Sequence, residues 1–291
     1  MVKRYGDLLL DTRRALLACE EAEIADMMAK QLVSHVTGKN IPALLLDRDL
    51  YAPAEVLREV QKGLDRLLDG EPLAYVLGEW EFYGLNLVVT PDVLIPRDDT
   101  VAVAQLAISQ GLFLDKDPRI LDLCCGSGCI GLAIASRVKD AKVTLADLSQ
   151  KALNVAKQNT ALNHLTGRVR CFQADATKPA PAFLGKFDMI VSNPPYITGQ
   201  EMKELPKSVA DFEPHMALYG GEDGLDFYRS IAQHYTPALK PGGYLALEFG
   251  MGQGDDVCRI LEAHGYTILE RSRDYNDRER AVLAQYGRKE A

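Results

Sequence analysis

Residues 119–131 read RILDLCCGSGCIG, and this stretch decides the fold class. Its first five residues predict a buried strand, because a short apolar run bounded by turn residues is typical of strands in a parallel sheet. Gly126 and Gly128 then permit a tight turn, and the residues from 128 to 138 predict a helix. A strand, a glycine turn and a helix in this order are typical of the ligand-binding turn of an open α/β sheet.

The same alternation continues from residue 98 to the end of the chain. We predict strands at 119–123, 142–146, 168–173, 187–191, 244–249, 266–270 and 280–285, and helices at 101–109, 128–138, 151–163, 225–239 and 254–264. This order predicts the α/β class, with a Rossmann-like, mostly parallel sheet and helices on both of its faces. Ligands of such sheets bind beyond the carboxyl ends of the strands.

The residues before 98 have a different pattern. Residues 1–75 are expected to be helical, with Ile24, Met28, Leu32 and His35 on one buried stripe and Pro53 at the first position of a later helix. The runs 79–83 and 85–89 predict a hairpin around Gly84. We therefore predict a helical domain at 1–75, a β-hairpin linker at 76–97 and an α/β domain at 98–291. The helical domain carries no catalytic cluster, so it either serves packing alone or docks a substrate.

Composition excludes several classes of protein. Of the 291 residues, 47% are hydrophobic and 25% are charged, which is ordinary for a folded globular chain. No apolar run approaches the ~20 residues that span a bilayer, and the apolar run at 8–10 is too short for a signal peptide. The six cysteines do not resemble a disulfide framework, so we expect a cytoplasmic protein. The net charge of −8 argues against a general attraction to nucleic acid, although it leaves room for a local basic patch.

Two acidic residues follow the next two strands and suggest a nucleoside site. Asp147 ends the second strand, where a carboxylate accepts hydrogen bonds from both ribose hydroxyls; alternatively it caps the next helix, for which Ser149 is equally placed. Asp175 follows the third strand and is placed to face an adenine amino group, or else it is a solvated loop residue. The spacing of Gly126, Gly128 and Gly131 also fits a dinucleotide fingerprint. A phosphate ligand would gain nothing from Asp122, however, whereas S-adenosylmethionine enzymes place such an acid near the methionine end of the cofactor.

The stretch Asn193-Pro194-Pro195-Tyr196 directly follows an apolar strand and is the most informative about chemistry. Two prolines remove two N–H donors and stiffen the loop. The Asn193 amide oxygen and the Pro194 carbonyl are acceptors, and Tyr196 offers an aromatic face. This set suits a planar NH₂ group whose two N–H bonds are accepted while its face is stacked. The alternative is a rigid turn with a structural Asn193.

With this loop, the glycine turn and Asp147, the chain resembles the class I S-adenosylmethionine-dependent methyltransferases that act on amino or amide nitrogen. More narrowly, it resembles the release-factor glutamine N5-methyltransferases, the HemK/PrmC family. The matching stretches run almost from end to end and are residues 78–84, 93–97, 120–123, 193–197, 212–214, 217–225 and 247–250. The Asn-Pro-Pro-Tyr loop alone is shared with enzymes that methylate adenine N6 in DNA or guanine N2 in RNA, whereas the Ile-Pro-Arg, Glu-Pro and Gly-Gly-Glu-Asp-Gly-Leu stretches are more specific.

The resemblance implies methyl transfer from S-adenosylmethionine to the glutamine side-chain nitrogen in the Gly-Gly-Gln loop of peptide chain release factors. It also implies that residues 1–75 dock this protein substrate, with no membrane and no direct nucleic-acid binding. Catalysis is assigned to Asn193, Pro194 and Tyr196, and substrate binding to these three residues and Pro195. Cofactor binding is assigned to Asp122, Cys124, Cys125, Gly126, Ser127, Gly128, Asp147, Leu148, Asp175, Ala176 and Asn193.

Three departures from the family pattern carry expectations of their own. Cys124 stands where the family usually has glycine, so the first turn is expected to be wider or to lack a positive φ. Asp98-Asp99-Thr100-Val101 stands where the family usually reads Pro-Glu-Thr-Glu, which changes the acidic contacts there. Ala176 stands where some relatives carry an aromatic residue, so stacking on adenine is expected to be weaker or to be supplied by Phe172.

Two other functions remain compatible with the residues alone. One is methylation of a ribosomal-protein glutamine or of an exocyclic amino group in nucleic acid, and the last of these requires a basic face and base flipping. The other is a non-catalytic nucleotide-binding module, which the intact Asn193 loop disfavours. We expect no metal, because Cys124, Cys125 and Cys129 lack the paired spacing of a zinc site.

Overall fold

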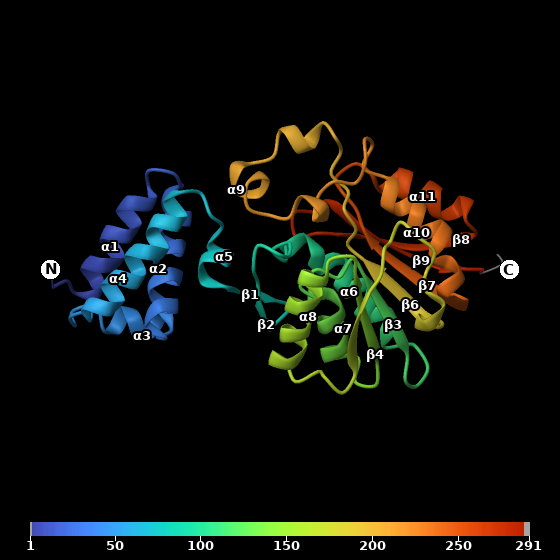
Figure 1. Ribbon diagram of the computed structural model, residues 1–291, viewed down its shortest axis with the longest axis horizontal. Coiled ribbons are helices and arrows are strands. Elements are labelled where there is room, and N and C mark those ends of the chain that lie inside the picture. Colours follow the sequence, from blue (N-terminus) through green and yellow to red (C-terminus); the bar gives the residue numbers. More distant parts are fainter. Residues whose placement is uncertain (1, 288–291) are drawn as a thin grey trace. The chain divides into compact units, whose positions relative to one another are not determined.

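The computed structural model describes residues 2–287, which form two compact units (Figure 1). One unit consists of Met1–Gly78 and Lys207–Phe212, and the other of Glu79–Pro206 and Glu213–Ala291. Met1 and residues 288–291, at the ends of the predicted domains, lie outside the described residues. The units divide after Gly78, three residues beyond the end predicted for the helical domain.

The first unit is helical. Its helices are α1 (Tyr5–Leu16), α2 (Ala22–Thr37), α3 (Ile41–Leu46), α4 (Ala54–Leu68), α5 (Leu73–Leu77) and the short α9 (Lys207–Ala210). The predicted buried stripe on α2 is only half right, since Met28 and Leu32 are buried but Ile24 is 41% exposed. Helices α2 and α4 pack closely at Gly63, where an ideal Cβ would lie 2.5 Å from Leu32 Cδ1. Pro53 is the N-cap of α4 rather than its first helical residue.

The second unit contains a seven-stranded sheet with the order β5-β4-β3-β6-β7-β9-β8. All neighbours are parallel except the pairs that β9 makes with β7 and β8. The sequence therefore predicted the fold class correctly. The strands are β3 (Arg119–Leu123), β4 (Lys142–Asp147), β5 (Val169–Gln173), β6 (Phe187–Ser192), β7 (Leu239–Glu248), β8 (Tyr266–Arg273) and β9 (Glu279–Tyr286).

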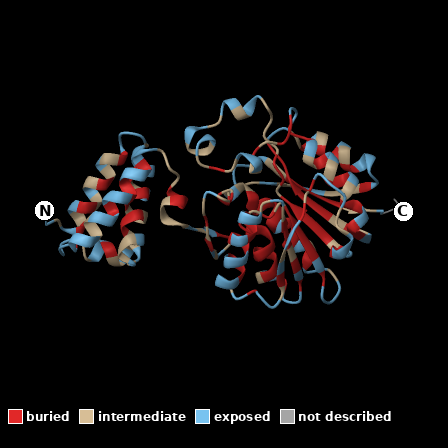
Figure 2. Cartoon of the chain, viewed as in Figure 1, coloured by how far each residue is buried: buried red, intermediate tan, exposed pale blue. Residues whose placement is uncertain are grey.

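Helices cover both faces of this sheet, and the buried strands appear red between them in Figure 2. Alternate strand residues point to opposite faces, so Ile120 belongs to one core and Leu121 to the other. The first face is covered by α6 (Val101–Gly111), α7 (Cys129–Arg137) and α8 (Gln150–Leu162). The second face is covered by α10 (Asp226–His234) and α11 (Gly254–Ala263).

The predicted hairpin is present as β1 (Glu79–Phe82) and β2 (Leu85–Val88). It packs within the second unit, because Phe82 and Leu87 are buried in the same core as α6 and α7. Asn159 of α8 holds it in place: its Oδ1 accepts from the Val88 N–H at 2.6 Å and its Nδ2 donates to the Val88 carbonyl at 3.0 Å. The same Nδ2 donates to the Ser127 carbonyl at 2.9 Å, so Asn159 joins the hairpin to the glycine turn.

Two other features complete the fold. The helix predicted over 225–239 ends at His234, and a 3-10 helix, Thr236–Ala238, follows it. Pro237 explains the break because it lacks the N–H that would continue the helix. Among residues 2–287, every helix is too short or too polar to cross a membrane.

Candidate active site

Three loops meet at the carboxyl edge of the sheet. They follow β4, β3 and β6, which are neighbours in the strand order. The chain leaves β3 toward β4 on one side and reaches β6 on the other, so this edge is the topological switch point at which α/β sheets bind ligands. The sequence predicted its three parts, which are the glycine turn after β3, Asp147 at the end of β4 and the Asn193 loop after β6.

The glycine turn has a left-handed backbone at three positions, with φ of +58° at Cys124, +52° at Gly126 and +83° at Gly128. Of the two alternatives expected for this turn, a backbone without a positive φ at Cys124 is therefore wrong. A non-glycine residue in this region costs about 1–2 kcal/mol, and the hydrogen bond from the Cys125 N–H to the Ala146 carbonyl at 3.0 Å helps to hold the turn. At Gly128 the positive φ favours glycine, and an added Cβ would also lie 2.9 Å from Leu145 Cδ1, so that side chain would have to shift.

Asp147 is oriented by two backbone donors. Its Oδ2 accepts from the Gly126 N–H at 2.9 Å and its Oδ1 from the Ser149 N–H at 2.8 Å. Ser149 itself caps α8, since its Oγ accepts from the Ala152 N–H at 3.2 Å. Burial raises the pKa of the Asp147 carboxyl above its usual value, while the two N–H groups lower it. Each oxygen keeps a free acceptor site for a ligand hydroxyl.

These residues line a cavity of about 170 Å³. The predicted site residues that line it are Cys124, Gly126, Asp147, Leu148, Asp175, Ala176, Asn193 and Pro195. The lining does not include Asp122, Cys125, Ser127, Gly128, Pro194 or Tyr196. The first group thus contacts this cavity directly.

Asp122 lies behind the glycine turn and is completely buried. Its Oδ2 accepts from the Gly131 N–H at 2.8 Å, and its Oδ1 has no partner among the described residues. Burial raises the pKa of this carboxyl to about 7. Gly131 fits here because a Cβ would lie 2.3 Å from Leu145 Cδ2, so the third glycine of the spacing serves the packing of α7 against β4.

Asp175 follows β5 and lines the same cavity. Other residues of the protein already occupy most of the acceptor sites of its carboxylate. Its Oδ1 accepts from the Thr177 N–H at 2.8 Å and from the Thr177 hydroxyl at 2.6 Å, and Lys178 Nζ lies 3.2 Å from Oδ2. Although burial raises the pKa of Asp175, these partners lower it below its usual value. Phe172 is absent from the cavity lining and pairs with Phe183, at 5.8 Å between ring centroids.

Hydrogen bonds and close packing hold the Asn193 loop in position. Asn193 Nδ2 donates to Thr100 Oγ1 at 3.2 Å, which leaves Asn193 Oδ1 available to a donor in the cavity. Gln253 Nε2 donates to the Tyr196 carbonyl at 3.0 Å. The loop at 220–224 packs directly on this one, because a Cβ at Gly220 would lie 2.6 Å from the Pro195 carbonyl oxygen.

The rest of the cavity wall was not predicted from the sequence. Residues 92–94, Pro214, Met216, Ala217 and Phe227 also line it. An ion pair between Arg97 and the buried Glu213 joins the segment that follows residues 92–94 to the segment that precedes Pro214. Glu213 Oε2 also accepts from the Ile95 N–H at 3.2 Å. The Ile-Pro-Arg and Glu-Pro stretches were signals of this wall, but a separation of 118 residues hid their contact.

These residues fit S-adenosylmethionine. The oriented Asp147 carboxylate suits the two ribose hydroxyls, and the left-handed turn at 124–128 lets backbone approach the ligand closely. The apolar side chains of Leu148 and Ala176 in the same lining suit a flat purine ring. Nothing in the lining is cationic, which suits a sulfonium better than a pyrophosphate.

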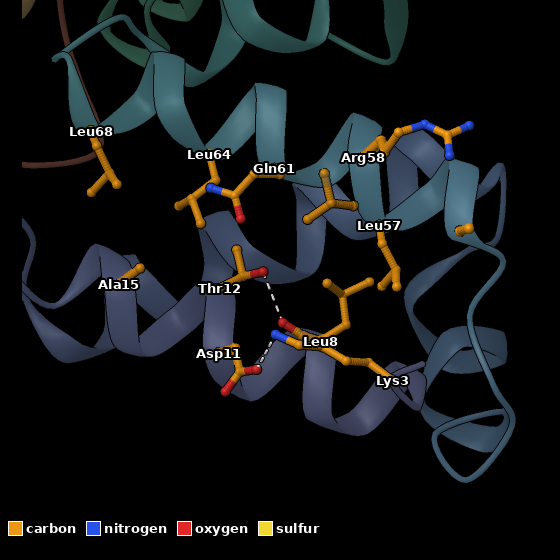
Figure 3. A pocket seen from close by; sticks show the side chains of 12 residues that line it. Lys3, Leu8, Asp11, Thr12, Ala15, Leu57, Arg58, Gln61, Leu64 and Leu68 are labelled. Carbon is orange, nitrogen blue, oxygen red and sulfur yellow. Dashed lines mark hydrogen bonds and ion pairs between the residues drawn. The ribbon is translucent and has the colours of Figure 1, made fainter. Parts of the chain in front are cut away.

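A larger cavity of about 600 Å³ lies between α1 and α4 of the helical unit (Figure 3). Its acidic side chain and its hydroxyl are already paired: Lys3 Nζ lies 2.6 Å from Asp11 Oδ2, and the Thr12 hydroxyl donates to the Leu8 carbonyl at 2.8 Å. It therefore offers no poised acid, base or nucleophile. In residues 2–287, no group of three His, Cys, Asp or Glu side chains is arranged to hold a metal.

Known proteins match both units. The family model of the PrmC N-terminal domain matches residues 7–78, and that of the methyltransferase small domain matches residues 104–210. The structure of a methyltransferase from Pyrococcus furiosus superposes with a TM-score of 0.52 and 17% identity, covering 78% of this chain and 100% of that one. The fold and the site thus define a class I methyltransferase.

Curated relatives narrow this class. A release factor glutamine methyltransferase of Clostridium acetobutylicum is 37% identical over 88% of this chain and 90% of its own length. One of Geobacter sulfurreducens is 36% identical over 96% of both chains. The chain belongs to the release factor glutamine methyltransferase family.

Proposed function

We propose that this enzyme transfers a methyl group from S-adenosylmethionine to the side-chain nitrogen N5 of the glutamine in the Gly-Gly-Gln motif of peptide chain release factors. The observation that carries the proposal is the direction of the Asn193 amide. Its NH₂ group is engaged by Thr100, so its oxygen remains for a donor at the cavity wall. The names of the curated relatives support release factors as the substrate.

The substrate nitrogen is a poor nucleophile because its lone pair is delocalised into the amide carbonyl. Asn193 Oδ1 and the Pro194 carbonyl accept its two N–H bonds, and Tyr196 borders the amide plane. These acceptors aim the lone pair and strengthen as the nitrogen gains positive character.

Bound S-adenosylmethionine supplies an electrophilic methyl group on its sulfonium sulfur. The substrate nitrogen forms a bond to this carbon while the carbon–sulfur bond breaks and its electron pair stays on sulfur. The nitrogen then loses one proton to water, so no general base is needed before the transfer. Asp147 would hold the ribose of S-adenosylmethionine through its two hydroxyls, since both of its carboxylate oxygens face the cavity loop by their backbone hydrogen bonds.

The helical unit is proposed to dock the release factor. It lacks a poised reactive group in its described residues, yet the substrate is a folded protein rather than free glutamine. We propose a cytoplasmic location, in which the six cysteines, none of them in a disulfide in this structure, would stay reduced.

The test is incubation with labelled S-adenosylmethionine and, in parallel, release factor, its glutamine-to-alanine variant, ribosomal proteins and DNA. We expect label in release factor only and none in the glutamine variant. Asn193→Ala should lower kcat at least 100-fold with a much smaller effect on cofactor affinity, because loss of one transition-state acceptor costs ~2.7–4 kcal/mol. Label in the glutamine variant at the normal rate would show that the target is wrong.

A further inference from the structure

The Asn193 loop has few backbone groups with which to hold itself in place. Pro194 and Pro195 have no N–H to donate, and in the proposed function the Pro194 carbonyl is kept for the substrate. The Asn193 end of the loop has an anchor of its own, since Asn193 Nδ2 donates to Thr100 Oγ1 at 3.2 Å. The Tyr196 end therefore needs a separate anchor if the two substrate acceptors are to stay in place.

That anchor is the side-chain amide of Gln253, which lies between β7 and α11. Its Nε2 donates to the Tyr196 carbonyl at 3.0 Å, and its Oε1 accepts from the Gly250 N–H at 2.9 Å. The Gly224 carbonyl, in the loop before α10, lies 3.5 Å from the same Nε2. One amide thus contacts the loop after β6, the turn after β7 and the loop before α10.

The neighbours of this amide allow it only one direction. A main-chain N–H only donates and a main-chain carbonyl only accepts. Exchanging the oxygen and the NH₂ group of Gln253 would therefore set donor against donor at Gly250 and acceptor against acceptor at Tyr196. Gln253 is also the residue before α11, yet its side chain makes no capping hydrogen bond to that helix. The amide is thus committed to the loops rather than to the helix.

Two glycines leave room for this arrangement. At Gly224, where φ is +73°, an added Cβ would lie 2.3 Å from the Tyr196 carbonyl oxygen and 2.5 Å from Gln253 Nε2. At Gly250 it would lie 2.9 Å from Gln253 Oε1 and 3.0 Å from Tyr196 Cδ2. The Gln253 amide therefore packs closely with both the carbonyl and the ring of Tyr196.

We propose that Gln253 is a positioning residue for methyl transfer, which holds the Tyr196 end of the loop so that the Pro194 carbonyl and the Tyr196 ring meet the substrate amide. This inference rests on the proposed function, in which those two groups face the glutamine nitrogen. Neither Gln253 nor Tyr196 lines the cofactor cavity. Loss of the Gln253 amide should therefore slow the transfer step and leave cofactor binding almost unchanged.

The test uses the full-length enzyme with release factor as substrate. Gln253→Glu keeps the shape and the acceptor for the Gly250 N–H, but it replaces the donor toward Tyr196 by a second acceptor. Gln253→Met keeps the length of the side chain and removes both hydrogen bonds. Each variant should lower kcat at least tenfold per folded site, counted by titration with S-adenosylhomocysteine. The Kd for this ligand should stay within threefold of the original value.

Gln285→Glu is the matched control. Gln285 Nε2 donates to the Gly242 carbonyl at 2.9 Å, so this variant loses the same kind of hydrogen bond near the amino end of β7, away from the loops of the site. Its kcat should stay within twofold of the original value. An unchanged kcat in either Gln253 variant would overturn the inference. Equal losses in Gln253→Glu and Gln285→Glu, or a fall in kcat matched by an equal loss of cofactor affinity, would overturn it as well.

A second readout does not depend on turnover. In enzyme labelled with 3-fluorotyrosine, the ¹⁹F signal of Tyr196, assigned by its loss in Tyr196→Phe, should shift in both Gln253 variants but not in Gln285→Glu. An unshifted signal in the Gln253 variants would overturn the inference. If the original enzyme leaves release factor unlabelled, the proposed function fails, while this signal still decides whether Gln253 positions Tyr196.

Discussion

Asp147 and Asp175 both line the cofactor cavity, but they differ in how many acceptor sites they have left. Each oxygen of Asp147 accepts one backbone N–H, whereas Asp175 is engaged by Thr177 and Lys178. We expect Asp147→Ala to raise the Kd for S-adenosylhomocysteine at least 100-fold, because two charge-assisted hydrogen bonds contribute ~1.5–3 kcal/mol each. Calorimetry measures this.

Asp175→Ala is the matched control at the same cavity. It should weaken binding much less, since its carboxylate offers little free acceptor capacity. Equal losses in the two variants would contradict the assignment of the ribose to Asp147.

Single residues also show where sequence patterns reach their limit. The cavity position of Asp147 followed from its place after a strand, because strand ends meet at one edge. The left-handed backbone of Cys124 did not follow, because cysteine rarely adopts that conformation and only the surrounding turn imposes it. The depth of Asp122 also needed the structure, since it depends on the packing of α7 over β3.

At the scale of elements, the Arg97–Glu213 ion pair joins two segments of the cavity wall. Glu213 is buried and Arg97 is 38% exposed, so removing the cation leaves a carboxylate with little solvent. We expect Arg97→Ala to destabilise the enzyme by about 2 kcal/mol, less than the ~3–5 kcal/mol typical of a completely buried pair. We also expect a roughly tenfold higher Kd for S-adenosylhomocysteine, because both segments line the cavity.

Thermal unfolding measures the loss of stability, and calorimetry measures the Kd for S-adenosylhomocysteine. Arg259→Ala is the control, since it removes a single exposed ion pair with Asp256 and should change neither quantity measurably. If Arg97→Ala lowers the melting temperature but leaves cofactor affinity intact, the ion pair serves the fold alone.

Strands and helices with a regular pattern of apolar residues were predictable from the sequence. Contacts between segments far apart in the sequence were not. The strands of the sheet and the hairpin have apolar patterns that burial on one or two faces imposes. The hydrogen bond from the Ile95 N–H to Glu213 joins residues 118 positions apart, and no local pattern records such a pairing. Pro237 is a sequence signal for the end of the helix at His234. The apolar pattern, however, continues to residue 239, and it led us to predict a longer helix.

At the scale of the whole molecule, every residue that lines the cofactor cavity belongs to the second unit. A chain that lacks residues 1–78 should therefore bind S-adenosylhomocysteine with unchanged affinity. Its KM for release factor should rise at least tenfold, because the proposed docking surface is gone. Steady-state kinetics with calorimetry on the same preparation measure both quantities.

Retained cofactor affinity is the internal control for folding in this experiment. A truncated enzyme that binds cofactor and methylates release factor with the original KM would show that the helical unit does not dock the substrate.

The helical unit is not one continuous stretch of sequence, because Lys207–Phe212 belongs to it with Met1–Gly78. The Phe212 ring lies 3.9 Å from an ideal Cβ at Gly70, so the two stretches are in contact. A recombination event that exchanged only the first 78 residues between relatives would separate these partners. We therefore expect inheritance of the two stretches to be linked, and productive chimaeras to need two crossover segments rather than one.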